Sequence, residues 1–349
     1  MATADVTIMG AGAFGLSIAW ECARRGARVR VCEAARIGAG SSGGIVGALA
    51  PHVPEQWNAK KQFQLDSLLM AERFWAGVRA AGGADPGYLR SGRVQPVADE
   101  AALALARGRS AGAAALWHGQ AVWEVVLAEE DGWLPKAPTG YLIRDTLTAR
   151  LHPRQAGIAL AAATRARGGR IEEGVAMPDG TAPVIWATGA AGLADLGAAL
   201  GRKVGGAVKG QAALFACPGV ATRPQLFVDG VHIVPHADGT VAVGSTSERD
   251  FDGADRVDEK LDPVIEKARA ACLALGDAPV IERWAGLRPR ARSRAPMLGA
   301  WPGRAGHFIA NGGFKIGIGM APKVAQVMAD LVLEGRDAIP EGFCVEDSL

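Results

Sequence analysis

Residues 4–34 read ADVTIMGAGAFGLSIAWECARRGARVRVCEA, and the pattern of this stretch decides the fold. A short apolar strand over residues 6–9 leads directly into a glycine-rich turn at 10–15. Apolar residues then recur at helical spacing from 16 to 22, and a second, alternating strand ends at Glu33. The stretch therefore predicts a strand–turn–helix–strand unit.

The turn has the GxGxxG spacing of a dinucleotide-binding fingerprint. Gly10 permits the tight turn, Gly12 lets a pyrophosphate approach the backbone, and Gly15 lets helix and strand pack closely. The N–H groups at the start of the helix hold phosphates, and Glu33 is placed to accept hydrogen bonds from ribose hydroxyls. Because 47 of the 349 residues are glycine, a bare match would arise by chance roughly once. The strand before the turn and the helix after it carry the prediction.

A long loop of small residues, 34–52, follows Glu33 where a simple NAD-binding domain would continue with another helix. A second GxGxxG match at 38–43 follows no evident strand, so we do not interpret it as a nucleotide fingerprint. The loop suits another task, because Ser41, Ser42 and many unobstructed backbone N–H groups can lie along a flat polar ring system.

Further strand–turn–helix patterns occur at 152–171, 183–192 and 306–335, far from the first unit. The sequence therefore predicts an α/β fold: a doubly wound, Rossmann-like domain interrupted by insertions that form an α+β substrate domain with a largely antiparallel sheet. We place the nucleotide domain at 1–85, 145–204 and 286–349, and the substrate domain at 86–144 and 205–285. Its expected strands are Gln211–Phe215, Leu226–Val228, His232–Val234 and Thr240–Val243.

Bulk properties limit the classes of function. The formal net charge of +2 is too near neutral to indicate nucleic acid or an anionic membrane as the main partner. Five scattered cysteines without a CxxC pattern, and no signal peptide or apolar run of membrane-spanning length, predict a cytoplasmic protein without a membrane span. The histidines lack metal-ligand spacing such as HxxxH, so we expect no metal site.

Residues 282–299, ERWAGLRPRARSRAPMLG, contain five arginines, of which Arg288 differs from the rest. The apolar segment 284–287 precedes it and Pro289 follows it, so a buried backbone carries this guanidinium. It could belong to a solvated basic loop, pair with a core carboxylate, or bind an anionic ligand. The third reading suits a planar carboxylate, because the arginine fork donates two parallel charge-assisted hydrogen bonds.

The chain resembles, from end to end, the FAD-dependent glycine/D-amino-acid oxidase family, and within it most closely the glycine oxidases. The segments that carry the resemblance are VTIMGAGAFG at 6–15, WAGLRP at 284–289 and NGGFKIGIGMAP at 311–322. The FAD contacts that it implies are Gly10, Ala11, Gly12, Ala13, Phe14, Gly15, Glu33, Ala34, Ser41, Ser42, Gly47, Ala48, Leu49, Val175, Gly189, Lys315, Ile316, Gly317, Ile318 and Gly319. The catalytic and substrate-pocket positions that it implies are Arg288, His232, Lys315, Ala48 and Ser247.

The resemblance implies oxidation of the C–N bond of a small amino acid or secondary amine: glycine, a D-amino acid or an N-methyl amino acid. Hydride passes to flavin N5, the imine is hydrolysed, and dioxygen or another acceptor reoxidises the flavin. Three departures from the family stand out. The β-meander between 171 and 187 is shortened, His232 replaces a tyrosine, and no cysteine lies near Lys315, so we expect non-covalent FAD.

Several alternatives stay open at this point. A 2-hydroxy-acid or alcohol dehydrogenase would use Arg288 together with a base for the hydroxyl proton, for which His232 is the candidate. A subunit that only holds FAD is a second alternative. An amine oxidase acting on modified tRNA is disfavoured by the near-neutral charge. The sequence leaves oligomerisation open.

Overall fold

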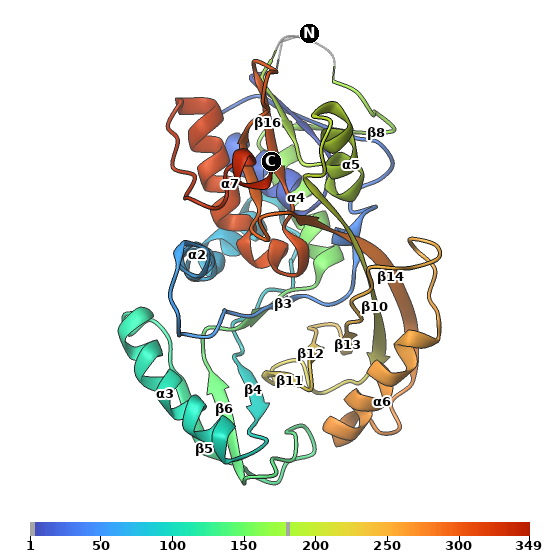
Figure 1. The fold of residues 1–349 in the computed structure, drawn as a ribbon. Coiled ribbons are helices and arrows are strands. Elements are labelled where there is room, and N and C mark those ends of the chain that lie inside the picture. Colours follow the sequence, from blue (N-terminus) through green and yellow to red (C-terminus); the bar gives the residue numbers. More distant parts are fainter. Residues whose placement is uncertain (1–3, 179–181) are drawn as a thin grey trace.

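The computed structural model describes residues 4–178 and 182–349 and has two parts, each built on its own sheet (Figure 1). The first part holds a six-stranded sheet of order β15-β16-β9-β1-β2-β8. Its strands are β1 Val6–Met9, β2 Val29–Glu33, β8 Arg170–Glu173, β9 Val184–Trp186, β15 Met297–Ala300 and β16 His307–Asn311. All neighbours pair in parallel except β15 and β16. The predicted doubly wound sheet is therefore confirmed, with one antiparallel edge strand.

Helices pack beside this six-stranded sheet, either on the sheet or on one another. They are α1 Ala13–Arg24, α2 Ala59–Gly82, α4 Pro153–Ala166, α5 Gly189–Ala199 and α7 Gly317–Glu334. Both α1 and α2 pack against α4 and α7. The close approach of α2 to α4 requires Gly82, because a Cβ there would lie 2.5 Å from the backbone nitrogen of Ala163. The stretch Phe314–Glu334 is long and apolar enough to cross a membrane, but it packs here as a core helix against α1 and α2.

The second part holds an eight-stranded sheet of order β14-β10-β13-β12-β11-β4-β6-β5. Its strands are β4 Arg93–Pro96, β5 Trp123–Leu127, β6 Tyr141–Asp145, β10 Gly205–Ala216, β11 Gln225–Val228, β12 Val231–Pro235, β13 Thr240–Gly244 and β14 Val280–Ala291. Only the β11–β4 pair among these is parallel, which confirms the predicted, largely antiparallel sheet. The remaining helices are α3 Glu100–Leu116, beside β5, and α6 Asp262–Ala271.

The two faces of the large sheet have different neighbours. One face packs against α6, where Phe215, Ile233 and Val243 join Ile265 in a hydrophobic core. The opposite face packs against residues 45–48, which lead into the short strand β3 Ala48–Leu49. Strand β3 pairs with β7 Ala149–Arg150 and passes between the two parts of the molecule (Figure 1). This inner face of the large sheet therefore looks toward the nucleotide domain.

Strands β10 and β14 are each 12 residues long and pair along most of their length. Strand β14 continues through residues 285 and 286, where we predicted a domain boundary. The two parts are thus linked by a continuous strand there, and the domain boundaries themselves stay a prediction.

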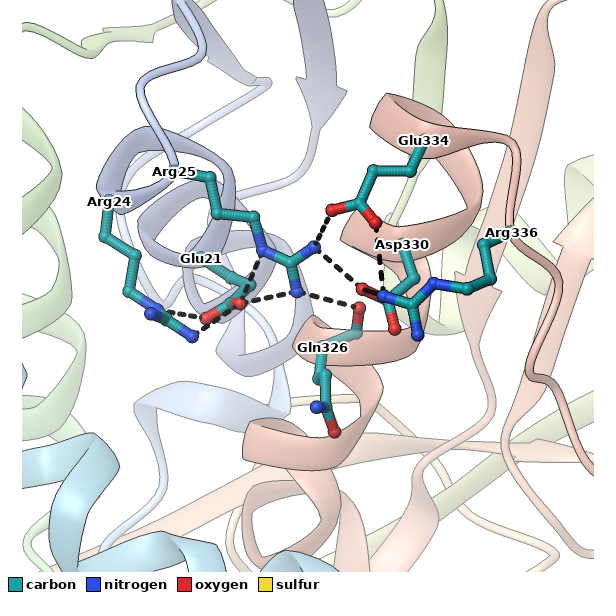
Figure 2. Close-up of polar contacts among 7 residues, drawn as sticks. All are labelled: Glu21, Arg24, Arg25, Gln326, Asp330, Glu334 and Arg336. Carbon is teal, nitrogen blue, oxygen red and sulfur yellow. Dashed lines mark hydrogen bonds and ion pairs between the residues drawn. The ribbon is translucent and has the colours of Figure 1, made fainter.

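A network of charged side chains joins the ends of α1 and α7 (Figure 2). Arg25 donates to Glu21 from the same helix and, at 2.7 Å, to Asp330 of α7. Both carboxylates are almost fully buried, with 1% and 2% exposure. Arg24 also contacts Glu21, and Arg336 contacts Asp330 at 2.8 Å. These contacts hold the helix that follows the glycine turn against the helix that follows the Lys315 loop.

Candidate cofactor and substrate site

The glycine turn between β1 and α1 has the geometry predicted for it. Gly10 adopts a φ of +101°, and a Cβ there would lie 2.5 Å from the carbonyl oxygen of Ala187 after β9. A Cβ at Gly15 would lie 1.9 Å from the carbonyl oxygen of Gly10. Any larger side chain at these two positions would therefore separate α1 from the sheet.

Glu33 and Ser42 hold the turn from outside. The Ala11 N–H donates to the Glu33 carboxylate at 2.7 Å, and the Ala13 N–H donates to the Ser42 hydroxyl at 2.9 Å. A Cβ at Gly12 would lie 3.1 Å from that hydroxyl oxygen. The absence of a side chain at Gly12 therefore lets the loop that carries Ser42 pass close to the backbone of the turn. The end of β2, the glycine turn and the loop after it therefore form one hydrogen-bonded unit.

A cavity of about 530 Å³ lies against this unit. Its walls come from the glycine turn, the loop 36–43, the first turns of α4, Trp284 of β14 and Ile318 of α7. Small residues dominate the part nearest the turn, and Arg36 and Arg154 supply positive charge. An elongated anionic nucleotide fits this combination, because backbone N–H groups and cations can both reach a pyrophosphate.

The sequence reasoning missed Arg36, Arg154 and Trp284 as cavity residues. Arg154 donates to the Gly43 carbonyl at 2.8 Å and pairs with Glu282, so it also anchors the loop to β14. No local sequence signal identifies it, because its partners lie more than a hundred residues away.

The predicted ring-contacting segment 47–49 lies beside the loop before α7. A Cβ at Gly47 would lie 1.7 Å from the Leu151 carbonyl oxygen, and a Cβ at Gly319 would lie 3.8 Å from the Leu49 Cα. Phe14 of the glycine turn reaches the same loop, since a Cβ at Gly313 would lie 2.7 Å from its ring. The structure therefore places the three predicted FAD segments next to one another.

Arg288 lies on β14 with its guanidinium buried. Its Nη2 donates to the Ser245 hydroxyl at 2.6 Å and its Nη1 to the Thr246 carbonyl at 3.1 Å. Gly210 on β10 provides the room, because a Cβ there would lie 1.9 Å from the guanidinium. Burial lowers the pKa of Arg288 to about 10, and Glu248 opposes that shift. Within residues 4–178 and 182–349 no carboxylate forms an ion pair with it.

The structure thus excludes two of the hypotheses for Arg288: it lies in no solvated loop, and it is not paired with a core carboxylate among the described residues. Glu248, the nearest acidic influence, is engaged by Lys209 and Lys260. The guanidinium keeps hydrogen-bonding capacity for an incoming anion. Its role as a substrate-binding residue remains a proposal.

Lys315 lies in the short turn η4 Phe314–Ile316, at the start of α7. Its Nζ is 5.9 Å from the centre of the Phe314 ring, whose other neighbour is the Arg290 guanidinium at 5.5 Å. The side chain reaches solvent, yet partial desolvation, and secondly Arg288, lower its pKa. Because the charge of Arg288 lowers the pKa of Lys315, the two cations lie within electrostatic reach of one another.

His232 lies on β12, opposite Gly244 on one side and Phe227 on the other. Its ring centre is 4.6 Å from that of Phe227, and its Nδ1 is buried without a hydrogen-bond partner. Burial, followed by the charges of Arg93 and Lys315, lowers its pKa to about 3. A neutral histidine with an unmet polar atom fits a pocket residue better than a satisfied core residue.

The structure places other predicted residues less centrally. Ser247 is exposed, and its neighbours Ser245 and Thr246 contact Arg288 instead. The Val175 N–H donates to the Glu33 carbonyl at 2.9 Å, which leaves only its own carbonyl for adenine. Gly189 begins α5 and accepts a hydrogen bond from Asn311.

Residues described by the structure include no group of three or more His, Cys, Asp or Glu arranged around a metal site.

The remaining predicted contacts are distributed as follows. Ala34 is exposed just after Glu33, Ser41 begins the turn η1 Ser41–Gly43, and Ile316 with Gly317 joins η4 to α7. All three places lie on segments that border the space described above.

Comparison with known proteins identifies the family of the chain. A family model described as FAD dependent oxidoreductase (DAO) matches residues 5–331. Glycine oxidase from Geobacillus kaustophilus is 25% identical over 381 aligned residues, covering 94% of this chain and 92% of that enzyme. Glycine oxidase from Pseudomonas aeruginosa is 30% identical over 132 residues, so that match spans only 38% of this chain and 36% of that enzyme.

Solved structures share the fold. The glycine oxidase of Geobacillus kaustophilus superposes with a TM-score of 0.83 at 23% identity, covering 98% of both chains. Iminodiacetate oxidase from Chelativorans sp. BNC1 gives 0.84 at 23% identity over 97% of this chain and 98% of that one. The predicted resemblance and the predicted cofactor, FAD, are confirmed by the family match, which extends over nearly the whole chain. The chain belongs to the DAO family of FAD-dependent oxidoreductases.

Proposed function

We propose that the protein oxidises the C–N bond of a small amino acid or secondary amine that carries a carboxylate. Bound FAD supplies the two-electron acceptor for this reaction. The observation that carries the proposal is Arg288: a buried guanidinium with no carboxylate partner among the described residues, close enough to Lys315 of the predicted FAD loop to lower its pKa.

Arg288 binds the substrate carboxylate and thereby fixes the position of the α-carbon. Ser245 and Thr246 each accept one hydrogen bond from a terminal nitrogen of the guanidinium, so the side chain is ordered before substrate arrives and each of these nitrogens keeps a second N–H. Gly210 leaves room for the guanidinium against β10. A carboxylate held in this way loses most of its rotational freedom, which is the main contribution that a binding residue makes to an orientation-dependent step.

The electrostatics favour a neutral amine. Arg288 and Lys315 both place positive charge near the pocket, and like charge disfavours the ammonium form of a substrate. A neutral amine needs no side-chain base to remove a proton before its C–H bond is broken. The site accordingly can work by orientation and electrostatics alone.

The same electrostatics argue against the C–O alternative. A hydroxy acid requires a base for its hydroxyl proton, and His232 was the candidate from sequence. With a pKa lowered to about 3, His232 is a poor proton acceptor at neutral pH. The amine reaction is therefore the function that the site supports best, with dioxygen or another molecule reoxidising the flavin.

Anaerobic titration of the purified flavoprotein tests the proposal. Glycine, sarcosine, iminodiacetate, a D-amino acid and the hydroxy acid matching it are added in turn, and flavin bleaching is followed by absorbance. We expect bleaching by at least one amine and none by the hydroxy acid. Bleaching by the hydroxy acid alone would establish the C–O alternative, and no bleaching by any compound would favour a subunit that only holds FAD.

A further inference from the structure

A second arginine faces the same side of the large sheet as His232. Arg93 lies on β4, opposite Gln225 of β11, and its residue is 6% exposed. Its Nε donates to Asp145 at 2.9 Å, while no acceptor contacts its two terminal nitrogens anywhere in the described chain. Its guanidinium carbon lies 5.8 Å from the centre of the Phe227 ring, which in turn contacts His232.

Other unmet polar groups lie at the same end of the sheet. The Nε2 of Gln95, two residues beyond Arg93 on β4, is buried without a partner, as is the Nδ1 of His232. The parallel register of β4 with β11, and the pairing of Phe227 with His232, put all these side chains on one face. Buried polar groups are normally hydrogen-bonded, so several together indicate a missing ligand.

The charges of the pocket point to the chemistry of that ligand. Arg288 lies close enough to Lys315 to lower its pKa, and Lys315 and Arg93 both act on His232, while Asp145 is the carboxylate that pairs with Arg93. A substrate with one carboxylate satisfies Arg288. Asp145 balances the charge of Arg93 through Nε and leaves the terminal N–H groups of Arg93 without an acceptor in the described part of the chain. Asp145 cannot swing to cover the terminal nitrogens of Arg93, because its second oxygen accepts from the Thr148 N–H at 2.8 Å.

We propose that Arg93, with Gln95 and His232, binds a second carboxylate, so that the preferred substrate is an amino acid with an acidic group at each end. This inference rests on the proposed amine oxidation and names the substrate class for the same pocket. Arg288 holds the carboxylate next to the reacting carbon, and Arg93 holds the distal one. Five strand spacings of about 4.8 Å separate the backbones of β14 and β4, and the row of Arg93 meets β14 near Glu282 rather than at Arg288. The two arginine side chains must therefore extend toward one another, along the strands as well as across them, to contact one molecule.

The test compares matched pairs of unreactive acids that differ only in the second carboxylate, such as butyrate with glutarate, over a series of chain lengths. Binding to the FAD-loaded protein is followed by perturbation of the flavin spectrum and, independently, by calorimetry. We expect the wild type to bind one dicarboxylate at least about tenfold more tightly than its monocarboxylate partner. The chain length of the dicarboxylate that binds most tightly reports the distance between the carboxylate sites at Arg288 and Arg93.

The main variant is the double substitution Arg93→Gln with Asp145→Asn, which removes both charges of the buried pair and leaves none unpaired. We expect it to reduce the preference to within about twofold while monocarboxylate binding stays the same. Arg144→Gln, an exposed arginine on β6, is the matched control and should keep the preference. Arg93→Lys keeps the charge should the double variant fail to fold, and it should lose part of the preference with the bidentate fork.

The outcomes separate this inference from the proposed function. A wild type without preference at any length, or a folded double variant that keeps the preference, would overturn the second carboxylate site. If amino dicarboxylates and amino monocarboxylates bleach the flavin with equal kcat/KM, amine oxidation stands and only this inference is wrong. If no amine bleaches the flavin but the dicarboxylate preference is present and depends on Arg93, the distal site stands and the reaction is wrong.

Discussion

At the scale of single residues, the unusual feature is positive charge that is buried and unpaired. Arg288 is held by a hydroxyl and a carbonyl, and neither neutralises it. Taking such a charge out of water is costly unless an anion meets it, so a protein retains it where a ligand provides the anion. His232 shows the complementary effect, because burial, and after it the charges of Arg93 and Lys315, lower its pKa and keep it neutral.

Arg288→Leu should retain FAD and fold normally but lose at least about tenfold in kcat/KM for amino acids, because a charge-assisted hydrogen bond contributes about 1.5–3 kcal/mol. Steady-state kinetics with flavin content measured on the same sample checks this. Arg292→Leu, an exposed arginine just beyond β14, is the control. Unchanged kinetics in Arg288→Leu would remove Arg288 from the site, and Arg288→Lys should recover only part of the loss.

His232 makes a prediction about pH. Its pKa is about 3 in the folded protein and near 6.5 when unfolded, so the unfolded chain takes up the proton first as pH falls. The stability that comes from a neutral His232 is complete above about pH 6.5 and declines toward pH 3. Between pH 7 and pH 5 we expect the wild type to lose about 2 kcal/mol of unfolding free energy that His232→Phe does not lose.

Urea unfolding of the two proteins at both pH values measures that difference. His118→Asn, at an exposed histidine with a φ of +50°, should behave like the wild type. Equal losses in the wild type and His232→Phe would show that His232 titrates near its ordinary pKa in the folded state.

At the scale of elements, the FAD segments depend on hydrogen bonds between an element end and a loop. The Glu33 carboxylate at the end of β2 accepts from the Ala11 N–H in the turn before α1, and Ser42 accepts from the Ala13 N–H. The turn is therefore shaped before the cofactor arrives. Such preorganisation reduces the entropy that binding must overcome.

Glu33→Ala should weaken FAD binding by about tenfold or more, because it removes a charged acceptor both from the Ala11 N–H and from the proposed ribose contact. Fluorescence titration of the apoprotein with FAD measures the change. Glu33→Gln keeps an acceptor for the Ala11 N–H and should fold as the wild type does. Full retention of FAD by Glu33→Ala after extended dialysis would contradict the role in ribose binding.

At the scale of the whole molecule, a mainly parallel sheet and a mainly antiparallel sheet form the two parts of the protein, and the strands β3 and β7 pass between them. The strands β10 and β14 extend from the large sheet, and α5 packs against both of them and against β16. On the opposite side of the nucleotide domain, the Arg25 network clamps α1 to α7 (Figure 2). The turn before α1 and the loop before α7, which both border the site, are therefore coupled through these two helices.

Arg25→Met should lower the free energy of unfolding by about 2–3 kcal/mol, because Glu21 and Asp330 stay buried with one cationic partner fewer. Burial opposes the charged form of Arg25, but Asp330 and Glu21 raise its pKa overall. Chemical denaturation of the FAD-loaded protein measures the loss. Arg336→Met, whose side chain is 59% exposed, is the control and should cost much less. Equal stability of Arg25→Met and wild type would show that the network is energetically neutral.

The sequence by itself determined the nucleotide half of the protein. The glycine turn, the helix after it and Glu33 at the end of the next strand lie within 31 consecutive residues, 4–34, and local chemistry decides their conformation. The strands β11, β12 and β13 were likewise predictable, because alternating apolar residues and turn residues are local signals. The special position of Arg288 followed from its apolar neighbours alone.

Only the tertiary structure decided what surrounds Arg288 and His232. Arg93 and Gln95 come from β4, more than a hundred residues before His232, and sheet register alone places them on its face. Arg154 likewise reaches Gly43 and Glu282 across the chain. Nothing local in the sequence marks these residues, because the register of strands far apart is set by packing on α6 and on the loop 45–48. The glycine turn and Glu33 were therefore local information, whereas the other walls of the cofactor cavity and the surroundings of Arg288 and His232 were not.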